Sequence, residues 1–127
     1  MKKVLQLFVI SLFVLQTNLF PQSPIVQQII DSVNIDSLIF FVKELSGEVP
    51  TIINGTPQTI LSRHRDQPGN ALAETYIKQK LESYGLPVTI QNYSSTGNNV
   101  LGTQVGTVYP NKKFIICAHY DDMPAGP

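Results

Sequence analysis

The feature that most constrains the fold is a continuously apolar run over residues 114–118, which the polar residues 119–122 follow at once. A short run without a polar residue is typical of a β-strand that is buried on both faces. Such a strand lies in the middle of a sheet, with other strands beside it and further layers over both faces. We therefore expect residues 114–118 to form a central strand.

Three stretches before this run carry apolar residues at helical spacing. They predict helices over residues 25–33, 38–45 and 70–84. The third stretch is the clearest, because its apolar positions fall on one face. Asn70 is a candidate N-cap for it, and Gly85 marks its end.

Strand patterns occupy much of the rest of the chain. Residues 88–93 alternate between apolar and polar, residues 99–108 predict a second strand, and residues 52–57 form a turn-rich connector. These elements predict an α/β chain with helices on two faces of a mixed sheet. Because residues 122–127 are loop-like and directly follow the central strand, we expect residues 23–127 to be the N-terminal portion of a larger, truncated domain.

The N-terminus has the pattern of a secretory signal peptide. Lys2 and Lys3 precede an apolar run over residues 4–15, and polar residues and Pro21 follow it. The run is shorter than the roughly 20 residues that a membrane-spanning helix needs. We predict a signal peptide over residues 1–22 and an exported protein, periplasmic or extracellular, with no stable membrane span. The alternative is a buried core helix.

Charge and cysteine content exclude other classes of protein. Lys and Arg together number 9, as do Asp and Glu, so the net charge is zero and nothing indicates a nucleic-acid partner. The single cysteine, Cys117, cannot form an internal disulfide, and its apolar neighbours predict a buried, inert thiol. Composition says nothing of the oligomeric state.

The candidate site residues are His119 and Asp121, directly after the predicted central strand. Ligands of open α/β sheets gather at the carboxyl ends of the strands. In extended backbone, residues two apart project to the same side, so these side chains should lie together. The pair could be a metal ligand with its orienting carboxylate, a pair for proton transfer, or a surface histidine bonded to a local aspartate. For Arg63 or Arg65 we expect a local ion pair.

Several motifs occur in a fixed order over residues 60–126: Ser62-Arg63, Gly69-Asn70-Ala71-Leu72-Ala73-Glu74-Thr75-Tyr76-Ile77, Leu81-Glu82-Ser83-Tyr84-Gly85-Leu86-Pro87-Val88, Asn99-Val100 with Gly106, and Ile115-Ile116-Cys117-Ala118-His119-Tyr120-Asp121-Asp122. This order resembles the opening of secreted zinc-dependent exopeptidases of the bacterial leucyl aminopeptidase and aminopeptidase Y type. The resemblance implies a three-layer α/β/α fold with a mixed, mainly parallel sheet, of which only the N-terminal part is present.

The resemblance also implies a function and roles for individual residues. The full-length protein would be a metallo-aminopeptidase, which hydrolyses peptide substrates at their N-terminus with two co-catalytic zinc ions. His119 matches a zinc ligand of the family, and Asp121 matches the carboxylate that orients this ligand. Tyr120 and Asp122 match positions to which we assign no role. The other ligands and a glutamate base would lie beyond Pro127, so we expect this chain alone to be inactive.

Three other readings remain open. Glutaminyl cyclases resemble these peptidases, carry a His-x-Asp at this strand end and bind one zinc. A non-catalytic binding module on the same fold is the second alternative, and the presence of both His119 and Asp121 speaks against it. A freestanding small domain with a merely structural His119 is the third.

Overall fold

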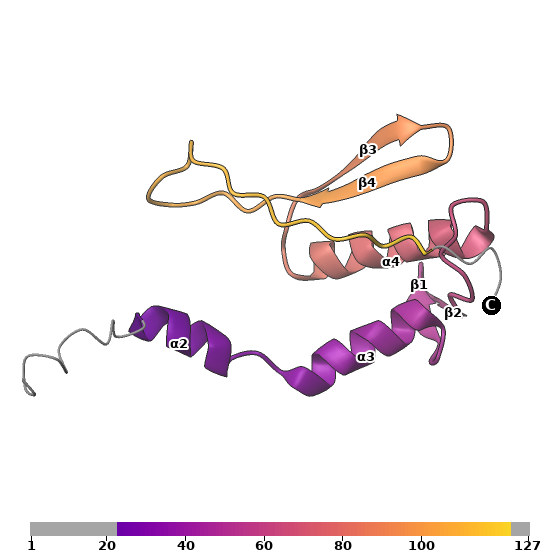
Figure 1. Cartoon of the computed structure of the whole chain (residues 1–127), viewed down its shortest axis with the longest axis horizontal. Helices are drawn as coiled ribbons and strands as arrows, with labels where there is room; N and C mark the ends of the chain where they lie inside the picture. Colours follow the sequence, from indigo (N-terminus) through magenta and orange to yellow (C-terminus); the bar gives the residue numbers. More distant parts are fainter. Residues whose placement is uncertain (1–22, 123–127) are drawn as a thin grey trace, which may run out of the picture. The chain divides into compact units, whose positions relative to one another are not determined.

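The computed structural model describes residues 23–122 (Figure 1). The predicted signal peptide, residues 1–22, and residues 123–127 lie outside this part, so the signal peptide stays a prediction. The described elements follow in the order α2, α3, β1, β2, α4, β3, β4. The chain divides after Ile35 into two units, and each is described by itself.

The first unit contributes helix α2, Pro24–Asp31, which confirms the helix predicted over residues 25–33. Proline suits the first turn because it lacks an N–H that would be unpaired there in any case. Within the helix, the Gln27 side-chain amide donates to the Asp31 carboxylate over 2.8 Å. The helix ends at Asp31, two residues before the predicted end, and Ser32 is its C-cap.

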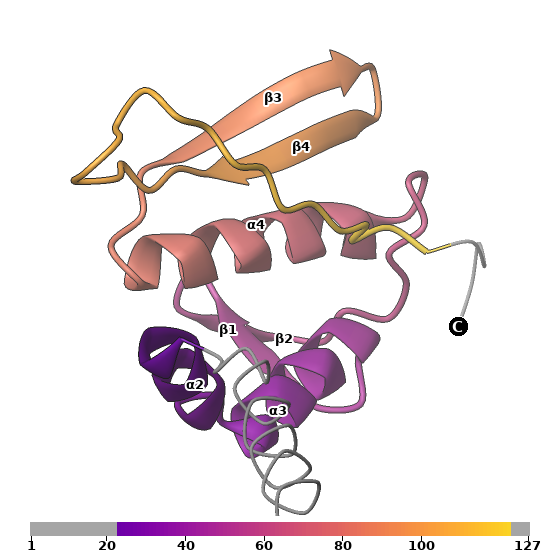
Figure 2. The same cartoon turned by 60° about the vertical axis from the view of Figure 1, so that its left-hand side comes forward.

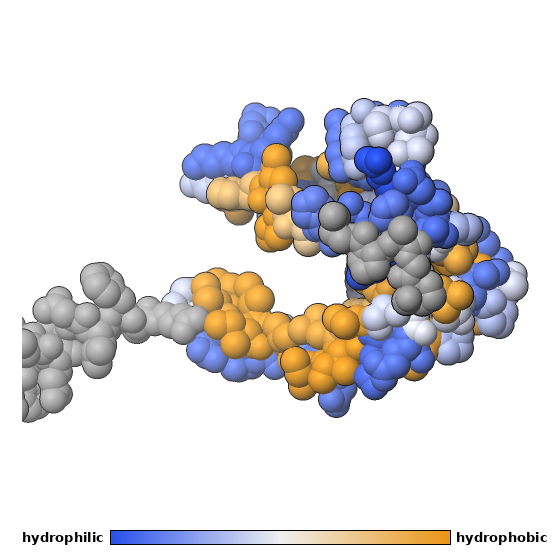
Figure 3. Space-filling view, turned by 45° about the vertical axis from the view of Figure 1, so that its right-hand side comes forward, coloured by the Kyte–Doolittle hydropathy of each residue, from blue (hydrophilic) through white to orange (hydrophobic). Residues whose placement is uncertain are grey.

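The second unit begins with helix α3, Ile35–Ser46, which starts three residues before the predicted position 38. Asp36 in its first turn and Lys43 in its last turn complement the helix dipole. Apolar side chains gather on this helix, where Leu38, Phe40 and Val42 are exposed (Figure 3).

A β-hairpin replaces the connector predicted over residues 52–57. Strands β1, Thr51–Ile53, and β2, Thr56–Gln58, pair antiparallel with Ile53 opposite Thr56. Asn54 and Gly55 between them both have positive φ, 51° and 78°, as a two-residue type I′ turn requires. The Asn-Gly turn was visible in the sequence, but strands this short leave no alternating pattern to recognise.

Helix α4, Pro68–Ser83, confirms the helix predicted over residues 70–84. Its N-cap is Gln67 and not Asn70, because Pro68 already occupies the first turn. At the other end the Leu86 and Gly85 amides donate to the Leu81 and Glu82 carbonyls over 3.2 and 2.9 Å. This is the Schellman arrangement, and it places Gly85 at a φ of 77°.

A second antiparallel hairpin follows α4. Strand β3, Val88–Ser94, pairs with β4, Gly97–Gly102, so the predicted strand 88–93 is confirmed, while the strand predicted over 99–108 begins and ends earlier. The hairpin contacts α4, and the Asn98 side-chain amide donates to the Glu74 carboxylate over 2.8 Å. After β4 the chain turns back and runs alongside α4 toward its N-terminal end (Figures 1 and 2).

The buried core of the second unit joins β1, α4 and the segment between β2 and α4. It consists of Ile53, Ile60, Ala73 and Tyr76, and Tyr120 packs against it. Beside it lies Glu44 of α3, only 4% exposed, whose carboxylate accepts a 2.6 Å hydrogen bond from the Tyr76 hydroxyl. The Lys80 ammonium lies 3.4 Å from the same carboxylate. A buried carboxylate needs such partners to offset its loss of water.

The central strand predicted over residues 114–118 is not observed. This segment has no assigned strand, and Phe114, Ile115 and Ile116 are 91%, 87% and 100% exposed. The apolar pattern alone cannot make a strand, because a strand also needs a hydrogen-bonded neighbour. Within residues 23–122, β1 pairs with β2 and β3 with β4, and neither hairpin pairs with this segment. The Cys117 thiol is likewise exposed instead of buried.

The described chain is therefore a small α/β protein with helices and two antiparallel two-stranded sheets. Both hairpins are local, so their antiparallel pairing follows from short connections, whereas parallel pairing needs a crossover of a dozen or more residues. The expected mixed, mainly parallel sheet between two helical layers is not found in residues 23–122.

Among the described residues, no single helix is both long and apolar enough to cross a membrane, and α2 and α3 meet that test only when taken together as a bent pair.

Candidate functional site

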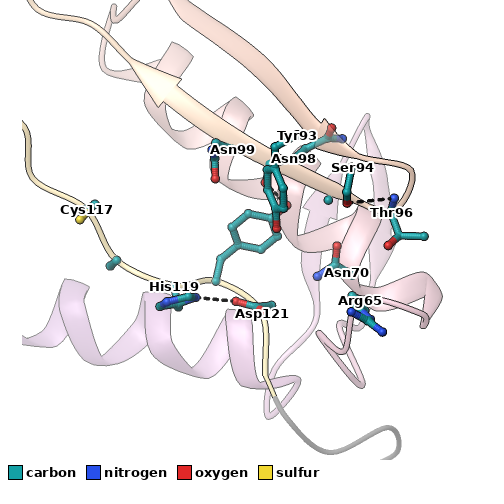
Figure 4. A pocket seen from close by; sticks show the side chains of 13 residues that line it. Arg65, Asn70, Tyr93, Ser94, Thr96, Asn98, Asn99, Cys117, His119 and Asp121 are labelled. Carbon is teal, nitrogen blue, oxygen red and sulfur yellow. Dashed lines mark hydrogen bonds and ion pairs between the residues drawn. The ribbon is translucent and has the colours of Figure 1, made fainter.

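His119 and Asp121 lie side by side, as the two-residue spacing predicts (Figure 4). The Nδ1 atom of His119 is 2.9 Å from Oδ1 of Asp121. The His119 side chain is 93% exposed and that of Asp121 51% exposed. The pair thus stands on the surface, where solvent or a ligand can reach both groups.

The contact has an electrostatic consequence for Asp121. The hydrogen bond with the His119 ring, together with the charges of His119 and Arg63, holds the pKa of the Asp121 carboxyl below its ordinary value. The carboxylate is therefore ionised and accepts the hydrogen bond when Nδ1 carries the proton. In that tautomer Nε2, on the opposite edge of the ring, has its lone pair available for a ligand.

Tyr120, between the two site residues, and Asp122, directly after them, contact the body of the protein. The Tyr120 hydroxyl donates to the Asn98 carbonyl of β4 over 3.0 Å. Burial and the negative charge of Glu74 raise the pKa of Tyr120, so the hydroxyl stays a donor. Extended backbone thus directs alternate side chains to opposite sides, with 120 and 122 inward and 119 and 121 outward.

Asp122 contacts Arg63, which lies in the segment before α4. One carboxylate oxygen, Oδ2, accepts the Arg63 backbone N–H over 3.0 Å and lies 3.6 Å from the guanidinium Nε. The other, Oδ1, is buried and has no hydrogen-bond partner among the described residues. The Arg63 carbonyl accepts from the Asp122 amide over 3.4 Å and from the Asn70 side chain over 2.8 Å.

A hollow of about 400 Å³ adjoins the pair (Figure 4). The β3–β4 hairpin, the start of α4 and the C-terminal segment all contribute to it. Its lining residues are Arg65, Asn70, Tyr93, Ser94, Thr96, Gly97, Asn98, Asn99, Cys117, Ala118, His119, Tyr120 and Asp121. Polar and apolar surface line it in nearly equal shares, and the polar share comes from amide, hydroxyl and charged groups.

The metal-binding capacity of the described residues is limited. No group of three or more His, Cys, Asp or Glu side chains within residues 23–122 could together hold a metal ion. A closed zinc site usually has four ligands, and a catalytic site three with an open position. His119 fits one ligand of such a site, through Nε2, and Asp121 fits the carboxylate behind it.

The second histidine offers a comparison. His64 and Asp66 have the same spacing, but their side chains are 3.9 Å apart, and Nδ1 of His64 accepts the Asp66 backbone N–H over 3.3 Å. This Nδ1 is therefore an acceptor and cannot carry the proton toward a carboxylate. The same two-residue spacing gives a different geometry in a turn.

Sequence reasoning missed the contact between Arg63 and Asp122. A local ion pair was predicted for Arg63 or Arg65, and Arg65 forms one with Asp66 at 3.6 Å. Arg63 pairs across 59 positions of sequence. The alternation that predicts 119 and 121 on one side also places 120 and 122 together on the other, which was the available indication that Asp122 faces inward.

Comparison with known proteins finds no matching family model, no matching curated protein and no matching solved structure.

Proposed function

We propose that this chain belongs to an exported zinc-dependent aminopeptidase, in which His119 binds a zinc ion through Nε2 and Asp121 orients the imidazole. The observation that carries the proposal is the 2.9 Å contact between Nδ1 of His119 and Oδ1 of Asp121. Metal-binding histidines usually donate their second ring N–H to a carboxylate or carbonyl, which fixes the tautomer and raises the basicity of the ligand nitrogen.

The ordered motifs of residues 60–126 support the peptidase assignment over proton transfer by an isolated pair. They include Gly69 to Ile77 at the start of α4 and Ile115 to Asp122 at the site. The exposed apolar residues 114–116 support the larger fold, because a contiguous apolar surface of this kind is usually covered in the complete assembly. In the proposal, these residues are a strand of a three-layer α/β/α domain with a mainly parallel sheet.

One imidazole cannot hold zinc firmly, so the proposal places the remaining ligands and the general base in sequence after Pro127. Bound zinc ions would supply Lewis-acid polarisation of the scissile carbonyl and lower the pKa of a water molecule. The part of His119 is to hold the metal at a fixed position. The part of Asp121 is to accept the hydrogen bond from the Nδ1–H group and keep Nε2 directed outward.

The proposal is tested on the protein expressed with everything that its reading frame encodes after Pro127. Hydrolysis of aminoacyl anilides should be abolished by a chelator and restored by zinc. His119→Ala should remove bound zinc and activity together, while His64→Ala keeps both. Full activity of His119→Ala would overturn the assignment.

Two other outcomes would identify the alternatives. Cyclisation of peptides with N-terminal glutamine, without hydrolysis of the anilides, would replace the peptidase by a glutaminyl cyclase-like enzyme. A protein that binds no zinc and catalyses neither reaction would be a binding module, and the proposal would be wrong.

A further inference from the structure

The His119–Asp121 pair is held in place by something other than its own attraction. Their side chains are 93% and 51% exposed, and an ion pair or hydrogen bond between such exposed groups contributes only a small free energy. That is less than the conformational entropy of two free side chains on a mobile backbone. A defined geometry therefore requires that the backbone of residues 119–121 be fixed from outside.

Within residues 23–122, the segment before His119 does not supply this constraint. Residues 114–116 are almost fully exposed and belong to no strand. The constraint comes from the two inward residues. Tyr120 packs against the core and donates to Asn98, and Asp122 meets Arg63. Asp121 lies between these two attachments.

The attachment of Asp122 to Arg63 is the more elaborate of the two. Backbone and side chain both take part: the Arg63 N–H reaches Oδ2 over 3.0 Å, the Asp122 N–H reaches the Arg63 carbonyl over 3.4 Å, and the guanidinium lies at 3.6 Å. Both side chains are about a quarter exposed, 25% for Arg63 and 30% for Asp122. Partial burial reduces the screening that weakens surface ion pairs.

Arg63 is in turn attached to α4. Its carbonyl accepts a 2.8 Å hydrogen bond from the side chain of Asn70 in the first turn of the helix. A chain of contacts thus leads from a helix of the core through Asn70 and Arg63 to Asp122, and from there to the site. The hydrogen bond from the Arg63 N–H to the Asp122 carboxylate is charge-assisted. Such bonds are stronger than neutral ones and fix orientation as well.

We propose that Arg63 and Asp122 are positioning residues, which fix the backbone beyond Asp121 so that its carboxylate faces Nδ1 of His119. Without them, the segment after Tyr120 is released and the carboxylate leaves the ring. The role in metal binding rests on the proposed function. The geometric role does not, because it concerns the pair before any metal binds.

The test uses nitrogen-15 NMR of the histidine rings in the full chain without metal, at a pH where imidazole is neutral. The chain has 2 histidines, so His64 serves as an internal reference. The unaltered chain should show His119 mainly as the Nδ1–H tautomer, held by Asp121. Asp122→Ala should shift it to the Nε2–H tautomer that a free imidazole prefers. Arg63→Ala removes the guanidinium but keeps the backbone bonds to Asp122, so it should shift the tautomer less.

Two further variants separate positioning from charge. Asp122→Asn keeps an acceptor for the Arg63 N–H and should restore most of the Nδ1–H tautomer. Lys78→Ala removes an equivalent charge from a side chain of α4 that pairs with Glu82, and should leave His119 unchanged. A tautomer ratio that is the same in Asp122→Ala and the unaltered chain would overturn the proposal.

Amide hydrogen exchange keeps the proposal testable if the alanine variants fail to fold. In the unaltered chain the Arg63 and Asp122 amides should exchange more slowly than the same amides in the unfolded chain. Rates equal to those of the unfolded chain would mean that the attachment does not persist in solution, and the proposal would be wrong. Neither measurement involves zinc, so a protein that passes both and binds no zinc would contradict the proposed function alone.

Discussion

The Tyr76 hydroxyl donates a 2.6 Å hydrogen bond to the carboxylate of Glu44, and this contact joins helix α4 to helix α3. Both residues are buried, at 3% and 4% exposure. The Lys80 ammonium completes the cluster, 3.4 Å from the carboxylate and 4.9 Å from the centre of the Phe41 ring. The fold therefore depends on a satisfied buried charge as well as on apolar packing.

Removal of the Tyr76 hydroxyl should destabilise the protein. Tyr76→Phe keeps the ring in the core but leaves the buried Glu44 carboxylate short of a donor, which costs about 1–3 kcal/mol of unfolding free energy. Urea unfolding followed by circular dichroism measures the change. The matched control is Tyr84→Phe, because Tyr84 is 63% exposed and its hydroxyl should contribute less than about 0.5 kcal/mol. Equal losses in both variants would contradict the role of the cluster.

The same cluster predicts how stability depends on acid. Burial alone would raise the pKa of Glu44, but hydrogen bonds from Thr51 and Tyr76 and the charge of Lys80 outweigh it and lower the pKa below the ordinary 4.5. A carboxyl with a lowered pKa in the folded state stabilises fully above its unfolded value, and the contribution is lost as the pH falls through the lowered value. We therefore expect the unfolding free energy to fall with acid in the range below 4.5.

Glu44→Gln identifies the source of this acid dependence. The variant is less stable at neutral pH, and its unfolding free energy should vary less with pH below 4.5 than that of the unaltered protein. Glu48→Gln is the control, since Glu48 is 58% exposed and pairs with the exposed Lys43. If Glu44→Gln kept the full acid dependence, another carboxyl would be responsible.

Substitution by alanine should lower the unfolding free energy by different amounts at Gly47 and at Gly85. Both end helices with a φ of 77°, so alanine at either position should lose about 1–2 kcal/mol through backbone strain. A Cβ at Gly85 meets nothing within 4 Å, whereas at Gly47 it would collide with the Ile60 carbonyl. Thermal unfolding should therefore show that Gly47→Ala is the more destabilising variant. Equal losses of stability in the two variants would show that the Ile60 backbone moves to accommodate the added methyl group.

The fold was predictable from sequence where the determinants are local. Helix α4 needed only its apolar face and Gly85, and the placement of Asp121 beside His119 followed from extended backbone. Residues 114–118 could not be predicted in this way, because an apolar run shows a tendency to be buried but not which strand would pair with it. The alternation of side chains indicates that Asp122 faces inward, but it does not indicate that Arg63 is its partner. That contact depends on tertiary structure.

Replacement of the Asp121 carboxylate should weaken metal binding without abolishing it. In the protein that contains the remaining ligands, Asp121→Asn removes the charge behind His119, and loss of such a partner typically costs roughly 10- to 100-fold in metal affinity or activity. Competition with a chromogenic zinc chelator measures the affinity. Asp66→Asn is the matched control, because Asp66 also stands two residues after a histidine but lies 3.9 Å from the His64 ring, whose Nδ1 accepts its backbone N–H. If Asp121→Asn bound zinc as tightly as Asp66→Asn, Asp121 would not orient a metal ligand.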